Sequence, residues 1–342
     1  MLGTIGVPPA SPDARRACIA GWGTAVPEQR LTNADLEQRV ETTDQWIVER
    51  TGIRERRVAR DGETTASLAV EAGAAAIKHA GLTPDAIDLM IVATATAEQL
   101  IPHTGAFVSD GLGLRCGSFD LNAGCAGFVY ELVVGSAMLT AGNLNHVLIV
   151  GSETLSRVVD PHDRGTCILF GDGAAAVVLS ATSEAGVGLL SFDLGVDGSA
   201  TGLLEIPAGG SRRPPTPDTV ANGEHYLKMA GQEVFRRAVR IVVDSATIAL
   251  ERAGVGVDEL AWFAPHQANI RIIDVAAQRL GIPAERTLVN IDRFGNTSAA
   301  SIPLVLAEAA DDGRLRDGDL VLLSGFGAGL TWGSAVLRWG RA

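Results

Sequence analysis

One pattern of apolar strands and helices occurs twice in this chain, about 170 residues apart, and this repeat limits the folds available to it. HAGLTPDAIDLMIV (79–92) ends a helix at a glycine and then enters an apolar run, and RAGVGVDELAWFA (252–264) does the same. Two further matches at nearly the same offset pair Gly142 with Gly313 and HVLIVGSE (146–153) with DLVLLSGF (319–326). A single echo is common among α/β proteins, but three in the same order predict a duplicated fold with a pseudo-twofold axis.

The apolar runs are continuous rather than alternating, which predicts strands that are covered on both faces. We expect a loose N-terminal arm (1–16) followed by two halves (17–185 and 186–342), with a Pro- and Gly-rich surface excursion at 205–226. The expected strands and helices of the first half are strands at 17–22, 88–96, 117–121, 146–153 and 174–180 and helices at 65–81 and 126–142.

Composition narrows the class of protein. With 46% hydrophobic and 20% charged residues the chain is globular, and its net charge of −12 argues against binding nucleic acid or an anionic membrane. The four cysteines have no paired spacing, and neither a signal peptide nor a long apolar run is present. We therefore expect a soluble cytoplasmic protein with reduced thiols and no metal site.

Cys125 is the candidate nucleophile. It lies in FDLNAGCAGFVYELVVGSAML (119–139), which reads as a strand, a sharp turn and a long helix. A thiol at the start of a helix is close to the positive end of the helix dipole, and this favours the thiolate. Gly124 and Gly127 let the backbone turn tightly there. The other three cysteines lack such a position and read as core residues.

Two polar residues follow strands in the second half. His266 comes directly after the apolar run WFAP, where α/β sheets place their sites, although a structural histidine is an equally good reading of this segment alone. Asn296 lies in VNIDRFGNTSAASIPL (289–304), expected to be a strand, a turn and a helix start. An ordinary N-cap is the simple alternative. However, Asn296 is 171 residues after Cys125, so the repeat places the two in equivalent turns that face each other.

The segment GFGAGLTWG (325–333) offers backbone N–H groups with few side chains. It is followed by a strand and not by a helix, so it does not fit a dinucleotide-binding loop. A loop of this kind can instead form an oxyanion hole beside a nucleophile.

Together, NAGCAGF, PHQANIRI, GNTSAAS and GFGAGLTWG resemble the motifs of β-ketoacyl-[acyl-carrier-protein] synthase III, a condensing enzyme of the thiolase superfamily. The resemblance runs from about residue 17 to the C-terminus and includes TTDQWIVERTGIRERR (42–57) and DRGT (163–166). It implies an α/β, thiolase-like fold of two duplicated βαβαβαββ halves with a layered α-β-α-β-α core, and a homodimer. It also implies decarboxylating condensation of an acyl-CoA primer with malonyl-acyl carrier protein in fatty acid biosynthesis.

The resemblance also assigns roles to residues. Cys125, His266 and Asn296 would form the catalytic triad, and the N–H groups of Cys125 and Ala328 the oxyanion hole, although many members have glycine at position 328. Ile101 of the partner subunit would close the primer pocket. No cofactor is implied beyond the coenzyme A thioester that serves as substrate. The residues implied to bind coenzyme A and its pantetheine arm are Thr42, Trp46, Arg50, Arg164, Gly231, Phe235 and Asn269.

An acidic carrier protein needs a basic patch on this acidic chain. The segment 231–254 reads as an amphipathic helix with arginines on its outer face, and another arginine follows Asn269. We expect the carrier to dock on Arg236, Arg237, Arg240 and Arg271.

Several alternatives stay open at this point. A starter-unit ketosynthase of polyketide or other secondary metabolism would carry the same motifs. A cysteine hydrolase on an α/β-hydrolase sheet needs glycine where Ala123 stands and leaves the repeat unexplained. A catalytically silent scaffold is disfavoured because all three triad residues are present.

Overall fold

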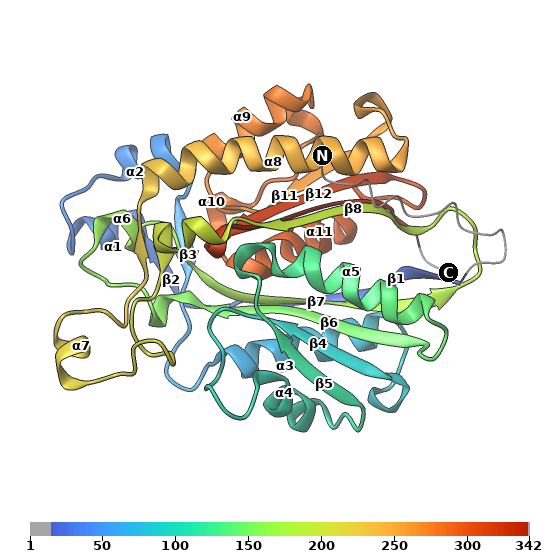
Figure 1. The fold of residues 1–342 in the computed structure, drawn as a ribbon, viewed down its shortest axis with the longest axis horizontal. Coiled ribbons are helices and arrows are strands. Elements are labelled where there is room, and N and C mark those ends of the chain that lie inside the picture. The colour runs from blue at the N-terminus through green and yellow to red at the C-terminus, as the bar shows by residue number, and fades with distance from the viewer. Residues whose placement is uncertain (1–14, 341–342) are drawn as a thin grey trace.

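The computed structural model describes residues 15–340, which form two β-sheets with helices between and outside them (Figure 1). Most of the expected N-terminal arm, residues 1–14, lies outside the described residues, and the first strand begins at Arg16. The N-terminal sheet has the order β1-β7-β6-β4-β5. Its strands are β1 (Arg16–Ala25), β4 (Leu89–Ala93), β5 (Gly117–Leu121), β6 (His146–Thr154) and β7 (Asp172–Thr182).

The C-terminal sheet repeats this arrangement with the order β8-β13-β12-β11. Its strands are β8 (Gly188–Val196), β11 (Trp262–Pro265), β12 (Leu320–Gly327) and β13 (Thr331–Arg338). In both sheets the first three strands pair antiparallel and the next pair is parallel. Where the N-terminal sheet has its fifth strand, β5, the C-terminal sheet has one parallel bridge between Phe263 and Thr287. Matching strand order and direction are what a duplicated fold requires.

The strand expected at the start of 289–304 is wrong. Helix α10 (Ile291–Phe294) occupies this segment instead. The cause is the buried side chain of Gln267, which donates to the carbonyl of Leu288 and accepts from the N–H of Asn290. These backbone groups are therefore not free to extend the sheet.

Helices complete five layers (Figure 1). Helices α8 (Gly231–Ala253) and α9 (Ile270–Leu280) cover the outer face of the C-terminal sheet. Helices α5 (Gly127–Thr140) and α11 (Ser301–Asp311) lie between the sheets. Helices α3 (Thr65–His79) and α4 (Thr104–Leu112) cover the remaining face of the N-terminal sheet. This α-β-α-β-α layering confirms the predicted fold class.

The middle layer brings the two halves into direct contact. Helix α5 is buried on nearly all sides, as its apolar sequence requires, and Phe128 and Leu132 pack with Ile302 and Val305 of α11. A methyl group at Gly151 on β6 would lie 2.5 Å from the carbonyl oxygen of Ala299, so only glycine fits there. The turns that precede α5 and α11 are therefore held against the two sheets and against each other.

Smaller elements surround one end of the sheets. Strands β2 (Arg30–Thr32) and β3 (Glu55–Arg57) pair with each other near helices α1 (Asn33–Glu37) and α2 (Asp44–Thr51). Helix α7 (Pro217–Ala221) lies in the excursion at 205–226, which projects from the body as expected (Figure 1). The remaining short elements are α6 (Arg164–Cys167), β9 (Leu204–Glu205) and β10 (Lys228–Met229).

Candidate active site

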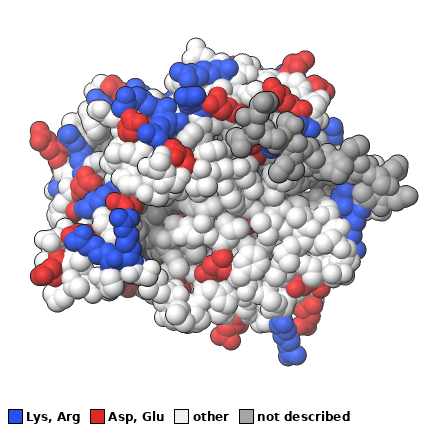
Figure 2. Space-filling view, viewed as in Figure 1, with Lys and Arg blue, Asp and Glu red and all other residues white. Residues whose placement is uncertain are grey.

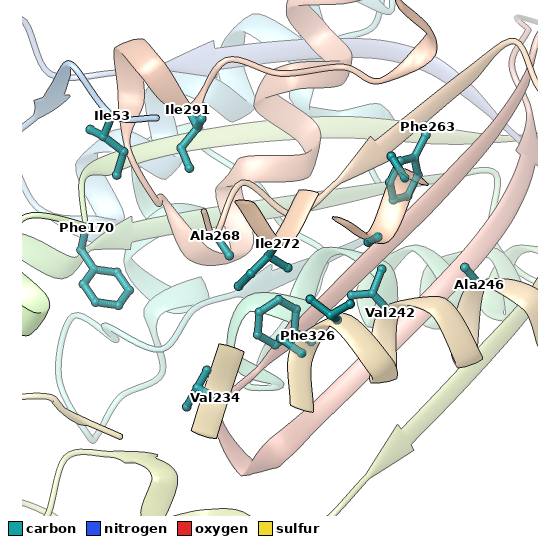
Figure 3. Packing of buried hydrophobic residues seen from close by; sticks show 14 of the residues in the cluster. Ile53, Phe170, Val234, Val242, Ala246, Phe263, Ala268, Ile272, Ile291 and Phe326 are labelled. Carbon is teal, nitrogen blue, oxygen red and sulfur yellow. The ribbon is translucent and has the colours of Figure 1, made fainter. Parts of the chain in front are cut away.

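One narrow cavity of about 90 Å³ contains all three residues predicted to do chemistry, Cys125, His266 and Asn296. It also reaches three of the residues predicted to bind the pantetheine arm, Gly231, Phe235 and Asn269. Its wall is largely apolar, and Figure 3 shows Ala268, Ile272 and Phe326 next to one another with Val234 of α8 close by. An apolar cavity with a few convergent polar groups is typical of a site that takes a small-molecule substrate.

Cys125 lies in the 3₁₀ turn Gly124–Ala126, immediately before α5. Gly124 has a φ of 52°, a conformation that favours glycine, and so the chain can reverse sharply there. Burial raises the pKa of the Cys125 thiol to about 12, and a hydrogen bond with Ser298 only partly opposes this. Desolvation thus opposes the thiolate that the start of the helix is expected to favour, and it has the larger effect on this pKa.

The loop predicted to form the oxyanion hole packs directly on the nucleophile. A methyl group at Gly327 would lie 2.4 Å from the backbone nitrogen of Cys125, so this position requires glycine. One added at Gly124 would lie 3.1 Å from the backbone nitrogen of Ala328. The backbone N–H groups of Cys125 and Ala328 thus belong to neighbouring turns, as an oxyanion hole requires.

His266 follows the end of β11 and is 3% exposed. Its backbone N–H donates to the carbonyl of Ser324, and its Nδ1 lies 2.6 Å from Oγ of Ser301, the first residue of α11. The rings of His266 and Phe326 form a T-shaped contact with their centroids 5.9 Å apart. Burial lowers the pKa of His266 to about 3, so the imidazole is neutral at physiological pH.

The backbone of Asn296 forms a parallel bridge with Phe170, where the chain enters β7. Its N–H donates to Leu169, and its carbonyl accepts from Gly171. Its side-chain Oδ1 accepts a hydrogen bond from the N–H of Ser298 at 2.9 Å. Because this N–H holds the side-chain oxygen, the NH₂ group of Asn296 is the part of the side chain that is available to the cavity.

The predicted equivalence of Cys125 and Asn296 needs a correction. The two turns are equivalent, since the 3₁₀ turns Gly124–Ala126 and Ser298–Ala300 each lead directly into a middle-layer helix. These turns are 174 residues apart, not 171. Cys125 therefore corresponds to Ala299, and Asn296 lies three residues before that position.

The residues predicted to bind coenzyme A fall into two groups. Trp46 on α2 has the guanidinium groups of Arg50 and Arg164 within 4.7 and 5.0 Å of its ring centroid. Gly231, Phe235 and Asn269 lie on the cavity wall. Thr42 lies just before α2, and its buried hydroxyl has no hydrogen-bond partner among the described residues.

Ile101 lies outside this cavity. It is 86% exposed, beside the equally exposed Leu100, in the connection between β4 and α4. Within residues 15–340 the predicted pocket-closing residue therefore does not reach the Cys125 of its own chain.

The predicted docking arginines differ in whether they form ion pairs with acidic side chains of the same chain. Figure 2 shows Lys and Arg side chains gathered over the N-terminal part of α8. Three of the four predicted docking arginines form ion pairs with nearby acidic residues: Arg236 with Glu233, Arg237 with Glu233 and Asp197, and Arg240 with Asp244. Arg271, at the start of α9, has no ion pair among the described residues and stacks on the ring of Phe235 at 5.4 Å.

Four residues around the site were not found from the sequence. Gln267 holds the end of β11, Ser298 and Ser301 contact the triad, and Glu153 is a fully buried carboxyl whose pKa is raised by burial. Gln267, Ser298 and Ser301 lie inside PHQANIRI and GNTSAAS, but serine and glutamine in an α/β chain have no distinctive spacing that would mark them.

The family model described as 3-oxoacyl-[acyl-carrier-protein (ACP)] synthase III matches residues 119–198, and the model of its C-terminal part matches residues 250–339. A β-ketoacyl-[acyl-carrier-protein] synthase III of Roseiflexus castenholzii is 50% identical, over 94% of this chain and 98% of its own.

Two solved structures are also similar. The β-ketoacyl-[acyl carrier protein] synthase III of Thermus thermophilus has a TM-score of 0.89 and 46% identity, covering 95% of this chain and all of its own. A priming β-ketosynthase from a polyketide biosynthetic pathway has a TM-score of 0.88 and 36% identity, covering 97% of this chain and 98% of its own. The polyketide enzyme is less similar in sequence than the Roseiflexus and Thermus synthases III, but another solved synthase III, at 31% identity, is less similar still.

Among residues 15–340, no group of three or more His, Cys, Asp or Glu side chains is placed to hold a metal ion. Within the same residues, no helix combines the length and the apolar character needed to cross a membrane.

Proposed function

The chain belongs to the β-ketoacyl-[acyl-carrier-protein] synthase III family, and on this premise we propose that it condenses an acyl-CoA primer with malonyl-acyl carrier protein. The products would be a 3-oxoacyl-acyl carrier protein, free coenzyme A and CO₂, and the reaction would initiate fatty acid synthesis. The observation that carries the proposal is that Cys125, His266 and Asn296 share one apolar cavity beside a loop that packs on Cys125.

In the first half-reaction the sulfur of Cys125 attacks the thioester carbonyl of the primer. The oxyanion forms against the N–H groups of Cys125 and Ala328, which cost nothing to orient because both turns are already packed together. The bond from carbonyl carbon to coenzyme A sulfur then breaks. The proton of the Cys125 thiol leaves with coenzyme A, and the acyl group stays on Cys125.

In the second half-reaction malonyl thioester takes the place of coenzyme A. Neutral His266 and the amide of Asn296 donate hydrogen bonds to its thioester carbonyl, which stabilises the enolate formed as the carboxylate leaves as CO₂. The resulting carbanion attacks the acyl carbonyl on Cys125. A carbon–carbon bond forms, the carbon–sulfur bond breaks, and the thiol is restored by a proton from solvent.

The cavity accounts for how the thioester arm would arrive. Gly231 and Asn269 at the starts of α8 and α9, together with Phe235, would line the channel for pantetheine. The Trp46 ring, with Arg50 and Arg164 beside it, offers an aromatic face and two cations for the adenine and phosphates. Thr42 would supply a hydroxyl near the same entrance.

A homodimer would explain why Ile101 is exposed. The middle of the face over α5 carries few charged side chains (Figure 2), and β5 is an unpaired sheet edge. The exposed apolar side chains in the first half are Leu100, Ile101, Phe107, Phe119 and Met138. A second copy packed on this surface would cover them and bring Ile101 of the partner subunit toward the primer pocket. Light scattering on the purified protein tests this directly.

A panel of acyl-CoA primers with malonyl-acyl carrier protein, read by mass spectrometry of the products, tests the proposed function. We expect 3-oxoacyl products from short primers, including branched ones, because Ile101 is smaller than the phenylalanine that family members restricted to short straight primers have at this position. Ile101→Phe should narrow the panel to short straight primers. Absence of any condensation product, with all substrates intact, would contradict the proposed function.

A further inference from the structure

Among the described residues, the hydroxyl of Ser301 is the only side-chain group that hydrogen-bonds the imidazole of His266. Its Oγ lies 2.6 Å from Nδ1, and both residues are buried. The other partner of this hydroxyl is the backbone N–H of Gln267, at 3.4 Å. That N–H is a donor, so it occupies a lone pair of the Ser301 oxygen.

These two contacts decide where the hydroxyl hydrogen goes. An N–H donor on one side leaves the hydrogen of Ser301 free to donate, and the recorded acceptor within reach is Nδ1 of His266. A neutral imidazole that accepts at Nδ1 must carry its proton on Nε2. The T-shaped contact with Phe326 further restricts the His266 ring, so Nε2 has one main orientation.

We propose that Ser301 is a positioning residue that fixes His266 as the Nε2–H tautomer, so that His266 meets the malonyl thioester as a hydrogen-bond donor. The inference rests on the proposed function for the use of that donor, but the tautomer itself is a property of the resting protein. The opposite tautomer would present a lone pair to a developing enolate and would repel it.

The arrangement matches that of Asn296. There, the N–H of Ser298 holds the side-chain oxygen, which leaves the amide N–H available to the cavity. Ser301 would do for His266 what the Ser298 backbone does for Asn296. The two donors that the condensation step needs would both be oriented before the substrate binds, from adjacent turns at the start of α11.

The first arm of the test reads the tautomer without any substrate. In protein labelled with ¹⁵N-histidine, long-range ¹H–¹⁵N correlation spectra distinguish Nε2–H from Nδ1–H, and comparison with His266→Ala identifies the signal. We expect the wild-type residue to be protonated on Nε2 near pH 7. Protonation on Nδ1 would overturn the inference, whatever the enzyme's activity.

The second arm uses Ser301→Ala. We expect kcat for decarboxylation of malonyl-acyl carrier protein to fall by roughly 10- to 100-fold, the loss typical when the partner that orients a metal-ligating histidine is removed. The KM and the self-acylation of Cys125 should change little, and the Nε2–H signal should weaken. Ser334→Ala is the matched control, because Ser334 is equally buried and bonds a serine, Ser324, without touching the His266 ring.

Thermal melts of both variants show whether they fold. A folded Ser301→Ala protein that decarboxylates at the wild-type rate would overturn the inference. Wild-type protein that shows the Nε2–H tautomer but never decarboxylates malonyl thioester would instead contradict the proposed function, so the two failures can be told apart.

Discussion

The side-chain oxygen of Asn296 accepts a hydrogen bond from the backbone N–H of Ser298, two residues further along the chain, at 2.9 Å. This contact fixes the orientation of the amide, because an oxygen bound to an N–H must have its NH₂ group on the opposite side. Asn296 is thereby a hydrogen-bond donor toward the cavity that it shares with Cys125 and His266.

His266→Ala and Asn296→Ala should therefore separate the two half-reactions. Each variant should lose decarboxylation of malonyl thioester by about 100-fold or more, since each removes a donor to the developing enolate. Self-acylation of Cys125 by acyl-CoA should largely persist, because it uses the N–H groups of Cys125 and Ala328. Release of ¹⁴CO₂ from labelled malonyl-acyl carrier protein and acyl labelling of the enzyme measure the two steps.

His146→Ala is a suitable control for that experiment. His146 also bonds a serine through Nδ1, Ser180 at 2.8 Å, but it lies at the start of β6, away from the cavity lining. If His266→Ala or Asn296→Ala released CO₂ as fast as the wild type, the assigned roles would be wrong.

The burial of Glu131 leads to a prediction about how the free energy of unfolding depends on pH. Glu131 is fully buried on α5, and burial raises its pKa well above the usual range, with only partial opposition from backbone hydrogen bonds of Val150 and Ala93. The folded state keeps this proton to a higher pH than the unfolded state, whose carboxyl titrates near 4.5. The stabilisation is complete below that value and is lost as pH rises toward the folded pKa, by about 1.4 kcal/mol per pH unit.

Glu131→Gln removes this titration and keeps the shape of the side chain. The variant should gain stability over the wild type as pH rises from 5.5 to 8, as measured by urea unfolding. Glu71→Gln, an exposed substitution on α3, should show no such pH-dependent gain. A constant difference between Glu131→Gln and the wild type across this range would show that Glu131 does not titrate as described.

The position of Arg271 leads to a prediction about how malonyl-acyl carrier protein docks. Arg271 lies at the start of α9 on the ring of Phe235, a cavity residue, and it has no ion pair among residues 15–340. Arg271→Glu should raise the KM for malonyl-acyl carrier protein several-fold at low salt, and this effect should shrink as salt increases. Self-acylation from acyl-CoA should be nearly unchanged, because that substrate enters without the carrier.

Arg279→Glu, at the opposite end of the same helix, is the matched control and should leave both half-reactions intact. Reversal of Arg236, Arg237 or Arg240 should have smaller effects, since each of these side chains is already paired with an acidic neighbour. Equal losses for Arg271→Glu in both half-reactions would mean that this arginine binds coenzyme A or serves the fold.

Much of the fold could be predicted because its signals are local. Continuous apolar runs predicted the buried strands, and the glycines that end helices marked the repeat, since Gly81, Gly142, Gly254 and Gly313 all have positive φ. Cys125 and His266 were found for the same reason. A thiol before a long helix and a histidine after a short strand are patterns that the chain shows within a few residues.

The parts that could not be predicted depend on packing between distant segments. The chain reaches Ser301 thirty-five residues after His266, and nothing in GNTSAAS shows that this serine meets the ring. The pKa of Cys125 likewise depends on how completely two sheets and a loop exclude water, which motif spacing does not record. The fifth strand of the C-terminal sheet was overestimated because a buried Gln267 side chain takes its backbone partners.

The central claim is that Cys125 carries the acyl group, and peptide mapping after incubation with acetyl-CoA tests it most directly. Intact-mass measurement should show one added acetyl group per chain. The modified peptide should contain Cys125, and Cys125→Ala should show no labelling while Cys116→Ala is labelled as the wild type is. Label on Cys18, Cys116 or Cys167, or labelling that survives Cys125→Ala, would contradict the account.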